Sequence, residues 1–221
     1  MAVVFVLFSN IPDIAGWQEG EVYLILGFII ITEGLHNIFF DGIWHIPALV
    51  FRGGLDVMLS RPVSPLYQVI SHELGLQGIG NTLIGVICLW LGLSSMGWLT
   101  PVSIAFCVLF IFTGTILRMS YNLISLSHAF WIHGGLANVG FLIHSIGEFA
   151  RYPVVIYPLF MRFILFFIIP AAFIGFVPAL IIRGDEVLLY SFGLIVVTVV
   201  YFLIARAIFY RGVRRYESIG M

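Results

Sequence analysis

Residues 74–117 decide the fold class, and they read LGLQGIGNTLIGVICLWLGLSSMGWLTPVSIAFCVLFIFTGTIL. This stretch contains no aspartate, glutamate, lysine or arginine. A helix needs about 20 apolar residues to cross the hydrocarbon core of a bilayer, so the stretch is long enough for two crossings. The run Ser94-Ser95-Met96-Gly97-Trp98 supplies a turn between its halves. We therefore predict membrane-spanning helices at about residues 76–94 and 100–127.

The rest of the chain has the same apolar character. Hydrophobic residues make up 61% of the 221 residues, charged residues make up 10%, and the mean hydropathy is +1.11. A soluble domain has about 25% charged residues. Further spans are predicted at residues 21–40, 163–182 and 187–205. The span at 163–182 is expected to be kinked by Pro170 and Pro178, which membrane helices tolerate.

The first eight residues, Met1 to Phe8, are apolar but too few to cross a bilayer. They lack the positive n-region and the small-residue cleavage site of a signal peptide. We interpret them as the second half of a first span and expect a truncated or mis-started chain. The predicted fold is all-α: a polytopic membrane helical bundle with about six transmembrane helices, the first incomplete, in a single domain over residues 1–221.

The arginines predict the orientation, because cytoplasmic loops of membrane proteins carry an excess of basic residues. If the spans alternate, the outer connections hold only Arg183, and Arg118 lies within a span. The inner segments hold the other eight arginines, which are Arg52, Arg61, Arg151, Arg162, Arg206, Arg211, Arg214 and Arg215. We therefore predict a multi-pass protein of the cell (plasma) membrane with a cytoplasmic tail at residues 206–221.

Several kinds of chemistry are excluded by composition. All ten basic residues are arginine, so the chain has no Walker A loop, no Schiff-base lysine and no serine–lysine dyad. The net charge of −1 supplies no basic field for nucleic acid. Cys88 and Cys107 lie inside apolar runs and indicate neither a disulfide framework nor a metal site.

An inner loop at about residues 41–73 is too long to be a simple turn. Its apolar residues recur at helical spacing on both sides of Gly53-Gly54, which predicts two short amphipathic helices with a glycine joint. Pro62 and Pro65 are expected to stop the second helix.

This loop has two interpretations. In the first, Leu55, Met58 and Leu59 pack on the spans while Asp56 and Arg61 face a soluble partner that delivers force. In the second, the loop is an elbow that only anchors the fold. The residues alone do not separate the two.

Four polar residues are predicted inside the spans. Glu33 lies one turn from His36, and Arg118 one turn from Asn122. Because charges are costly in a membrane, these side chains indicate a polar lining of a substrate path or a Glu33–Arg118 lock between two helices. The alternative is that Arg118 extends to the inner headgroups and Glu33 is protonated or hydrogen-bonded.

A second inner segment, at about residues 128–161, is amphipathic and is predicted to lie at the inner interface. The histidines of this segment lack the ligand spacing of a zinc site, and so does His72-Glu73 in the preceding loop. We therefore predict no metal. A membrane-embedded enzyme would use His133, His144 and Glu148.

Two stretches carry a resemblance to a known family. Residues 54–65 read GLDVMLSRPVSP and match the pattern G-x-D-x-x-L-x-R-P-x-S-P, and residues 211–220 read RGVRRYESIG and match R-G-x-R-R-Y-x-S-x-G. The chain resembles one branch of the ABC-2 family transporter permeases. A third agreement with this branch, in its penultimate span, comes from Arg151-Tyr152-Pro153, Ile156-Tyr157-Pro158, Ile169-Pro170 and Val177-Pro178-Ala179.

The resemblance implies a six-helix transmembrane subunit of an ATP-binding cassette transporter. Because the chain has no P-loop lysine, it cannot itself hydrolyse ATP in the P-loop manner, and another polypeptide must supply the energy. The resemblance also implies two partners: a cytoplasmic ATPase that binds ATP and Mg, and a second related permease or a second copy of this chain. No cofactor is expected in this chain. The expected activity is export of a hydrophobic or amphipathic substrate. The residues expected to couple to the ATPase are Gly53, Gly54, Asp56, Arg61, Pro62, Ser64 and Pro65. A passive channel or scaffold gated by Glu33 and Arg118 is the other alternative.

Overall fold

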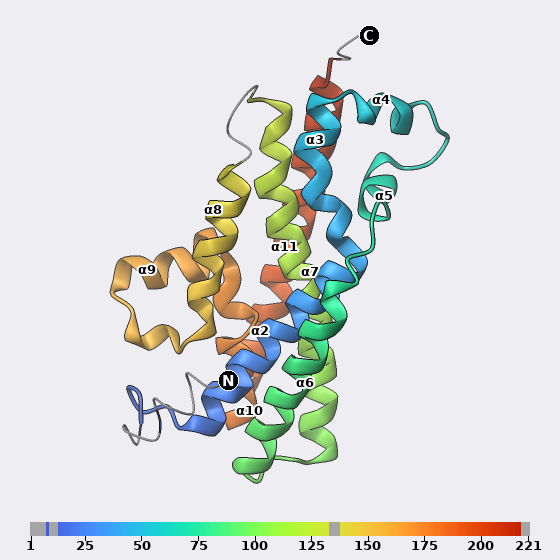
Figure 1. Ribbon diagram of the computed structural model, residues 1–221. Coiled ribbons are helices and arrows are strands. Elements are labelled where there is room, and N and C mark those ends of the chain that lie inside the picture. Colours follow the sequence, from blue (N-terminus) through green and yellow to red (C-terminus); the bar gives the residue numbers. More distant parts are fainter. Residues whose placement is uncertain (1–7, 9–12, 133–137, 218–221) are drawn as a thin grey trace.

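The protein is a bundle of helices in a computed structural model that describes residue 8, residues 13–132 and residues 138–217. Within these residues no β-strand is formed, and Figure 1 shows long helices crossed at one end by short ones. The α-helices are α2 (Glu19–Phe40), α3 (Ile46–Phe51), α4 (Gly54–Leu59), α5 (Pro65–Ile70), α6 (Gln77–Ser95), α7 (Pro101–Ser127), α8 (Asn138–Gly147), α9 (Leu159–Phe163), α10 (Phe176–Arg183) and α11 (Val187–Arg215).

Short turns of other helix types connect them. A π-helical turn, η5, follows α9, and the remaining connecting turns are 3-10 helices. They are η1 (Asp41–His45), η2 (His128–Phe130), η3 (Glu148–Arg151), η4 (Val154–Ile156), η5 (Ile164–Ile168) and η6 (Pro170–Phe173).

Four helical stretches are long and apolar enough to cross a membrane. They contain α2, α6, α7 and α11 and coincide with the predicted spans at 21–40, 76–94, 100–127 and 187–205, which are confirmed as helices of spanning length. The half-span predicted at Met1–Phe8 lies outside the described residues apart from Phe8. The described residues therefore support four spans, or five if the bent pair that follows is one span.

The fifth predicted span, 163–182, is not one kinked helix. Its two arms, Leu159–Ile168 and Pro170–Arg183, are bent by 71° at Ile169. Pro170 has no N–H to continue the first arm, and Ile169 before it adopts an extended backbone (φ −124°, ψ 92°). The prediction that Pro178 also kinks the span is wrong. It lies in the first turn of α10, where the missing N–H would have no helical partner.

The closest helix packing joins α2 and α6. Three glycines on each helix, spaced seven residues apart, face the other helix: Gly20, Gly27 and Gly34 on α2, and Gly78, Gly85 and Gly92 on α6. A methyl group at Gly78 would lie 2.3 Å from the Gly34 carbonyl oxygen, and one at Gly27 would lie 2.8 Å from the Leu89 nitrogen. The two backbones are thus in contact, which only glycine allows.

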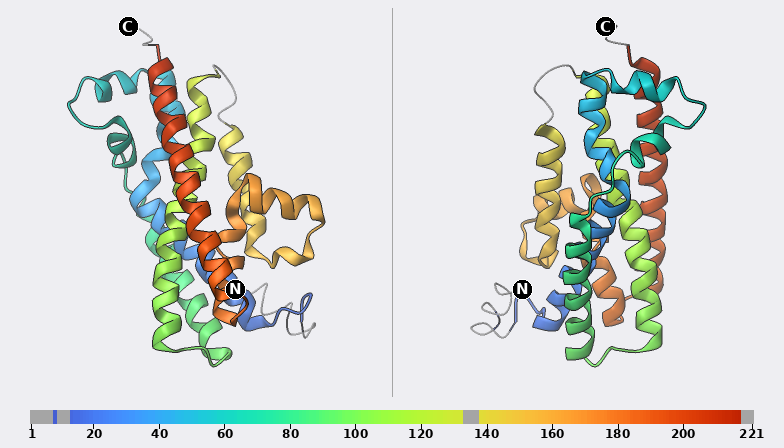
Figure 2. Two further views of the ribbon diagram at one scale, coloured as in Figure 1. Left: turned by 180° about the vertical axis from the view of Figure 1, so that it is seen from behind. Right: turned by 45° about the vertical axis from the view of Figure 1, so that its right-hand side comes forward.

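The last helix, α11, packs along α7 with one narrow stripe (Figure 2). Its buried residues are Leu194, Thr198, Ala205, Phe209 and Gly212. Nine of its large apolar side chains are exposed, among them Leu188 at 88% and Phe192 at 69%. This composition suits a helix that faces lipid on most of its circumference.

The two ends of the bundle differ in charge. The short helices α3 and α4 lie at the same end as the C-terminal end of α11, so Arg52 and Arg61 lie there together with Arg211, Arg214 and Arg215 (Figure 1). At the other end Arg183 is surrounded by acidic side chains. It lies 3.6 Å from Glu21, forms an ion pair with Asp185, and its guanidinium stacks 4.9 Å above the Trp17 ring.

The segment predicted to lie flat at the inner interface, 128–161, is built differently. Its helix α8 runs alongside α7 instead of across the end of the bundle, and short turns then lead to α9 (Figure 1). Ile143 and Ile146 pack against the main core, and a methyl group at Gly147 would lie 3.6 Å from the Tyr121 hydroxyl. Two of the polar residues that made the sequence look interfacial, His144 and Glu148, are part-buried here, and Glu148 forms an ion pair with Arg151.

Candidate functional site

The four polar residues predicted inside the spans face the interior of the bundle. The exposed fraction is 1% for His36 and Asn122 and 3% for Arg118, while Glu33 is part-buried. The Asn122 Nδ2 atom lies 3.0 Å from the His36 Nε2 atom, which joins α7 to α2. Glu33 and His36 are three residues apart on α2, and Arg118 and Asn122 are four apart on α7, so each pair lies on one face of its helix.

Arg118 does not extend to the bundle end. Its Nη2 atom donates a hydrogen bond of 3.3 Å to the Ile29 carbonyl on α2, and its Nε atom is buried without a partner. Glu33 does not pair with it either. The Glu33 carboxylate instead accepts a hydrogen bond of 3.0 Å from Arg151, and the same guanidinium forms an ion pair with Glu148.

Arg151 is the member of this cluster that sequence reasoning missed, because it was counted among the inner arginines. A signal was present: Glu148 and Arg151 are three residues apart, which is the spacing of a helical ion pair. In the structure η3 carries both residues to the level of Glu33. One arginine on η3 therefore neutralises carboxylates from two elements.

The structure also merges two sets of residues that the sequence kept apart. His144 and Glu148, considered above for an enzyme, lie beside Glu33, while His133 falls outside the described residues. We call Glu33, His36, Arg118, Asn122, His144, Glu148 and Arg151 the polar cluster. It contains two carboxylates and two guanidiniums, so its formal charge balances when its histidines are neutral.

Burial shifts the pKa values of the two groups on and after α8. Burial and the negative charge of Glu33 raise the pKa of Glu148, and the positive charges of Arg151 and Arg118 act in the opposite direction. Burial and the positive charge of Arg118 lower the pKa of His144 below its usual 6.5. His144 is therefore neutral at pH 7.

Three residues of the cluster have donor atoms close enough to hold a metal ion. One oxygen each from Glu33 and Glu148 and one nitrogen from His144 lie within 4.8 Å of one another. Arg151 already contacts both carboxylates, so a metal ion would have to displace this guanidinium. The arrangement is that of an ion-pair network between α2 and η3.

The loop at 41–73 forms helices on both sides of the predicted glycine joint, and we call it the coupling segment after the role that the sequence predicts for it. Helix α3 ends at Phe51, α4 begins at Gly54, and Gly53 between them has a left-handed backbone with φ of +73°. Leu55 and Met58 are buried.

The two prolines of the coupling segment have different places. Helix α4 ends at Leu59 with its C-cap at Ser60, so Pro62 stands two residues beyond the cap, where a proline prevents a helix from continuing, in agreement with the prediction. Pro65 is instead the first residue of a third helix, α5, and the Ser64 side chain caps it. Arg61 and Pro62 are exposed.

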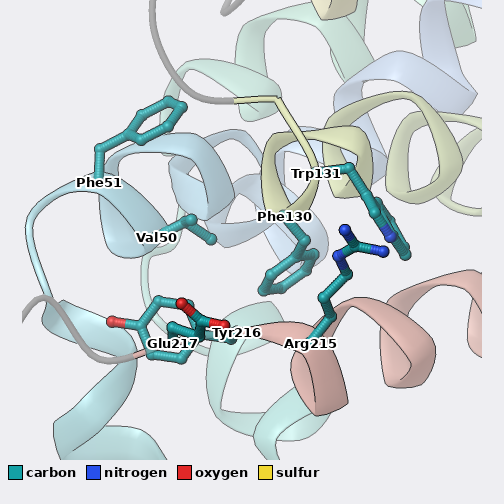
Figure 3. A pocket seen from close by; sticks show the side chains of 7 residues that line it. All are labelled: Val50, Phe51, Phe130, Trp131, Arg215, Tyr216 and Glu217. Carbon is teal, nitrogen blue, oxygen red and sulfur yellow. The ribbon is translucent and has the colours of Figure 1, made fainter.

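A pocket of about 280 Å³ lies between the coupling segment and the C-terminal end of α11. Its walls come from α3, from η2 with Trp131 after it, and from the last residue of α11 with the tail (Figure 3). The guanidinium of Arg215 points toward the Trp131 ring, and Phe130 lies between Val50 and that arginine (Figure 3). The lining residues are Val50, Phe51, Phe130, Trp131, Arg215, Tyr216 and Glu217.

Comparison with known protein families agrees with this arrangement. The model of the ABC-2 family transporter proteins matches residues 1–220. The chain belongs to this family. An ABC-2 protein of this kind is a membrane permease subunit of an ABC transporter, and the family implies association with an ATPase subunit. Neither the curated proteins nor the solved structures gave a match.

Proposed function

We propose that this ABC-2 permease subunit exports a hydrophobic or amphipathic substrate, powered by a separate cytoplasmic ATPase. It pairs with a second related permease or with a second copy of itself. Its arginine-rich end, with the C-terminus, faces the cytoplasm, as the excess of basic residues there favours.

The observation that carries this proposal is the packing of the coupling segment. Leu55 and Met58 of α4 are buried in a cluster that also contains Met119 of α7 and Phe209 of α11. Arg61 on the same segment is exposed and Asp56 is half-buried. The segment is thus anchored on two spans and carries the exposed charge of Arg61 just beyond α4, so a push on it from a soluble protein can reach both spans.

The polar cluster supports a closed path in this conformation. Glu33, Glu148 and Arg151 tie α2 to η3, and His36 and Asn122 tie α2 to α7. Opening a path between these elements requires breaking the ion pairs, which are strong in a low-dielectric environment unless water or a polar substrate replaces them.

Purification of the full chain from its native membrane tests the partners. The proposal requires a soluble ATPase with a P-loop in the isolated complex, and ATP-dependent movement of an amphipathic fluorescent substrate in reconstituted vesicles. Ion conductance from the purified chain alone, without nucleotide, would instead support a channel.

Charge reversal tests the coupling segment. The double variant Asp56→Arg with Arg61→Glu is expected to abolish the stimulation of ATP hydrolysis by substrate. Glu186→Arg is the matched control, because Glu186 is an exposed charge at the opposite end of the bundle. Wild-type stimulation in the double variant would show that this segment does not couple.

A further inference from the structure

The coupling segment is firmly attached to the α2–α6 pair. Chain continuity joins it to α2 through η1, and a methyl group at Gly42 of η1 would lie 2.0 Å from the Val69 carbonyl oxygen of α5. At its other end the Gly75 N–H donates a hydrogen bond of 2.9 Å to the Asn37 carbonyl of α2. The glycine contacts between α2 and α6 then hold these two helices together.

The same segment also contacts the last helix, far away in sequence. Met58 of α4 lies in one buried cluster with Ala205 and Phe209 of α11. One residue further along α11, the Tyr210 hydroxyl lies 2.9 Å from the Ser64 hydroxyl. Beyond the helix, burial and the negative charge of Asp56 raise the pKa of Tyr216. The loop motif and the tail motif of the sequence thus meet in space.

Helix α11 is the least buried of the long helices in the described part of the chain. Five of its residues are buried, and the last two of them, Phe209 and Gly212, pack against Phe130 of η2. It lacks the glycine contacts that hold α2 against α6 along their length. Its one close glycine contact within the described residues is near its C-terminal end, where a methyl group at Gly212 would lie 2.3 Å from the Phe130 ring. A helix held along one stripe can tilt while keeping a contact at one end.

From these contacts we infer that α11 is the helix that the coupling segment moves, and that Ser64 and Tyr210 are positioning residues for this movement. The inference rests on the proposed function, because it needs an ATPase that pushes the segment. The α2–α6 pair provides the support, α4 and Ser64 provide the contact, and α11 tilts against α7.

Distance measurement between spin labels tests the inference in the complex with the ATPase. Leu83 on α6 and Val196 on α11 are 61% and 40% exposed and accept labels, after the buried Cys88 and Cys107 are replaced by alanine. Trapping ATP is expected to change this distance in the otherwise wild-type complex. In Ser64→Ala and in Tyr210→Phe, the population in the shifted conformation is expected to fall about fivefold, the factor that one hydrogen bond allows.

Controls separate positioning from folding. Ser60→Ala and Tyr67→Phe lie on the same segment, and the Ser60 hydroxyl bonds only locally, to the Val57 carbonyl, so both are expected to behave as wild type. Ser64→Thr keeps the hydroxyl and is expected to restore the shift. Thermal stability is expected to match the wild type in Tyr210→Phe, Ser60→Ala, Tyr67→Phe and Ser64→Thr. It is expected to be lower in Ser64→Ala, which also loses the cap of α5, so Tyr210→Phe is the variant that separates positioning from folding.

The outcomes distinguish the two proposals. An ATP-dependent shift that is the same in Ser64→Ala, Tyr210→Phe and wild type overturns the role of the two residues and leaves the transporter function intact. ATP-driven transport without any shift between α6 and α11 overturns the inference as a whole. A complex without ATP-dependent transport overturns the proposed function, and the inference with it.

Discussion

The glycine contacts between α2 and α6 allow a measurement of how much close packing stabilises this protein. In Gly78→Ala, the added methyl carbon would lie 2.3 Å from the Gly34 carbonyl oxygen and 3.0 Å from the Ile38 nitrogen. Ordinary contact begins at 3.4 Å, so the helices must separate by roughly 1 Å at this point. A gap of that size removes a quarter to a half of the dispersion energy of the atoms that face it.

The expected loss combines two opposite effects. Overpacking of a tight interface costs about 1–3 kcal/mol. Replacing glycine by alanine within a helix returns about 1 kcal/mol of helix propensity. Gly80→Ala isolates the second effect, because Gly80 lies two residues away on α6 and a methyl group there meets nothing within 4 Å. The difference in unfolding free energy between the two variants is therefore expected to be about 1–3 kcal/mol.

Thermal unfolding in detergent measures this difference. Cys88 and Cys107 are both buried, so a thiol-reactive fluorophore reports when the bundle opens. Gly80→Ala is expected to unfold at or above the wild-type temperature, and Gly78→Ala several degrees below it. Gly85→Ala is expected to follow Gly78→Ala, because its methyl carbon would lie 2.7 Å from the Ile31 nitrogen. Equal unfolding temperatures for Gly78→Ala and Gly80→Ala would refute the close contact of the two backbones.

Three further predictions concern the polar cluster and the coupling segment. Glu33→Gln and Arg151→Gln are each expected to lower the free energy of unfolding by about 1–3 kcal/mol, which is less than for a fully buried pair because Arg151 is partly exposed. The double variant is expected to lose less than the sum of the two, and additive losses would contradict the ion pair. His144 lies near Glu33, Arg118 and Arg151, and because its folded-state pKa is below 6.5 the folded state binds fewer protons there, so the contribution of His144 to stability falls as the pH drops below 6.5. Between pH 7.5 and 5.5, the unfolding temperature of His144→Gln should therefore fall less than that of the wild type, and equal falls would refute this. Gly53→Ala is expected to lower the free energy of unfolding by about 1 kcal/mol, because the left-handed backbone at φ +73° disfavours a side chain even though the nearest atom is 3.5 Å away. Gly53→Asn is expected to lose less, since asparagine adopts this backbone more readily. Equal stability of the glycine, alanine and asparagine forms in the same fluorophore assay would refute this.

The polar cluster was only partly predictable. Glu33, His36, Arg118 and Asn122 could be chosen from the sequence because a polar residue within an apolar run must find a partner. Their actual partners could not be chosen, because Arg151 lies 118 residues from Glu33 and reaches it only after α8 folds back along α7. The predicted Glu33–Arg118 lock paired the two charged residues that the sequence places inside the predicted spans at 21–40 and 100–127.

The sequence alone determined the helical class, the four long spans and the glycine joint at Gly53, because these follow from local composition, hydrophobic length and backbone freedom. It also determined that the chain has no P-loop lysine. Only the tertiary structure decided that 163–182 breaks into two arms, that α8 carries Glu148 and Arg151 into the bundle, and that the coupling segment meets Phe209 and Tyr210 of α11. These features depend on contacts between residues distant in the chain, and hydrophobic periodicity carries no record of which distant partner a side chain will meet.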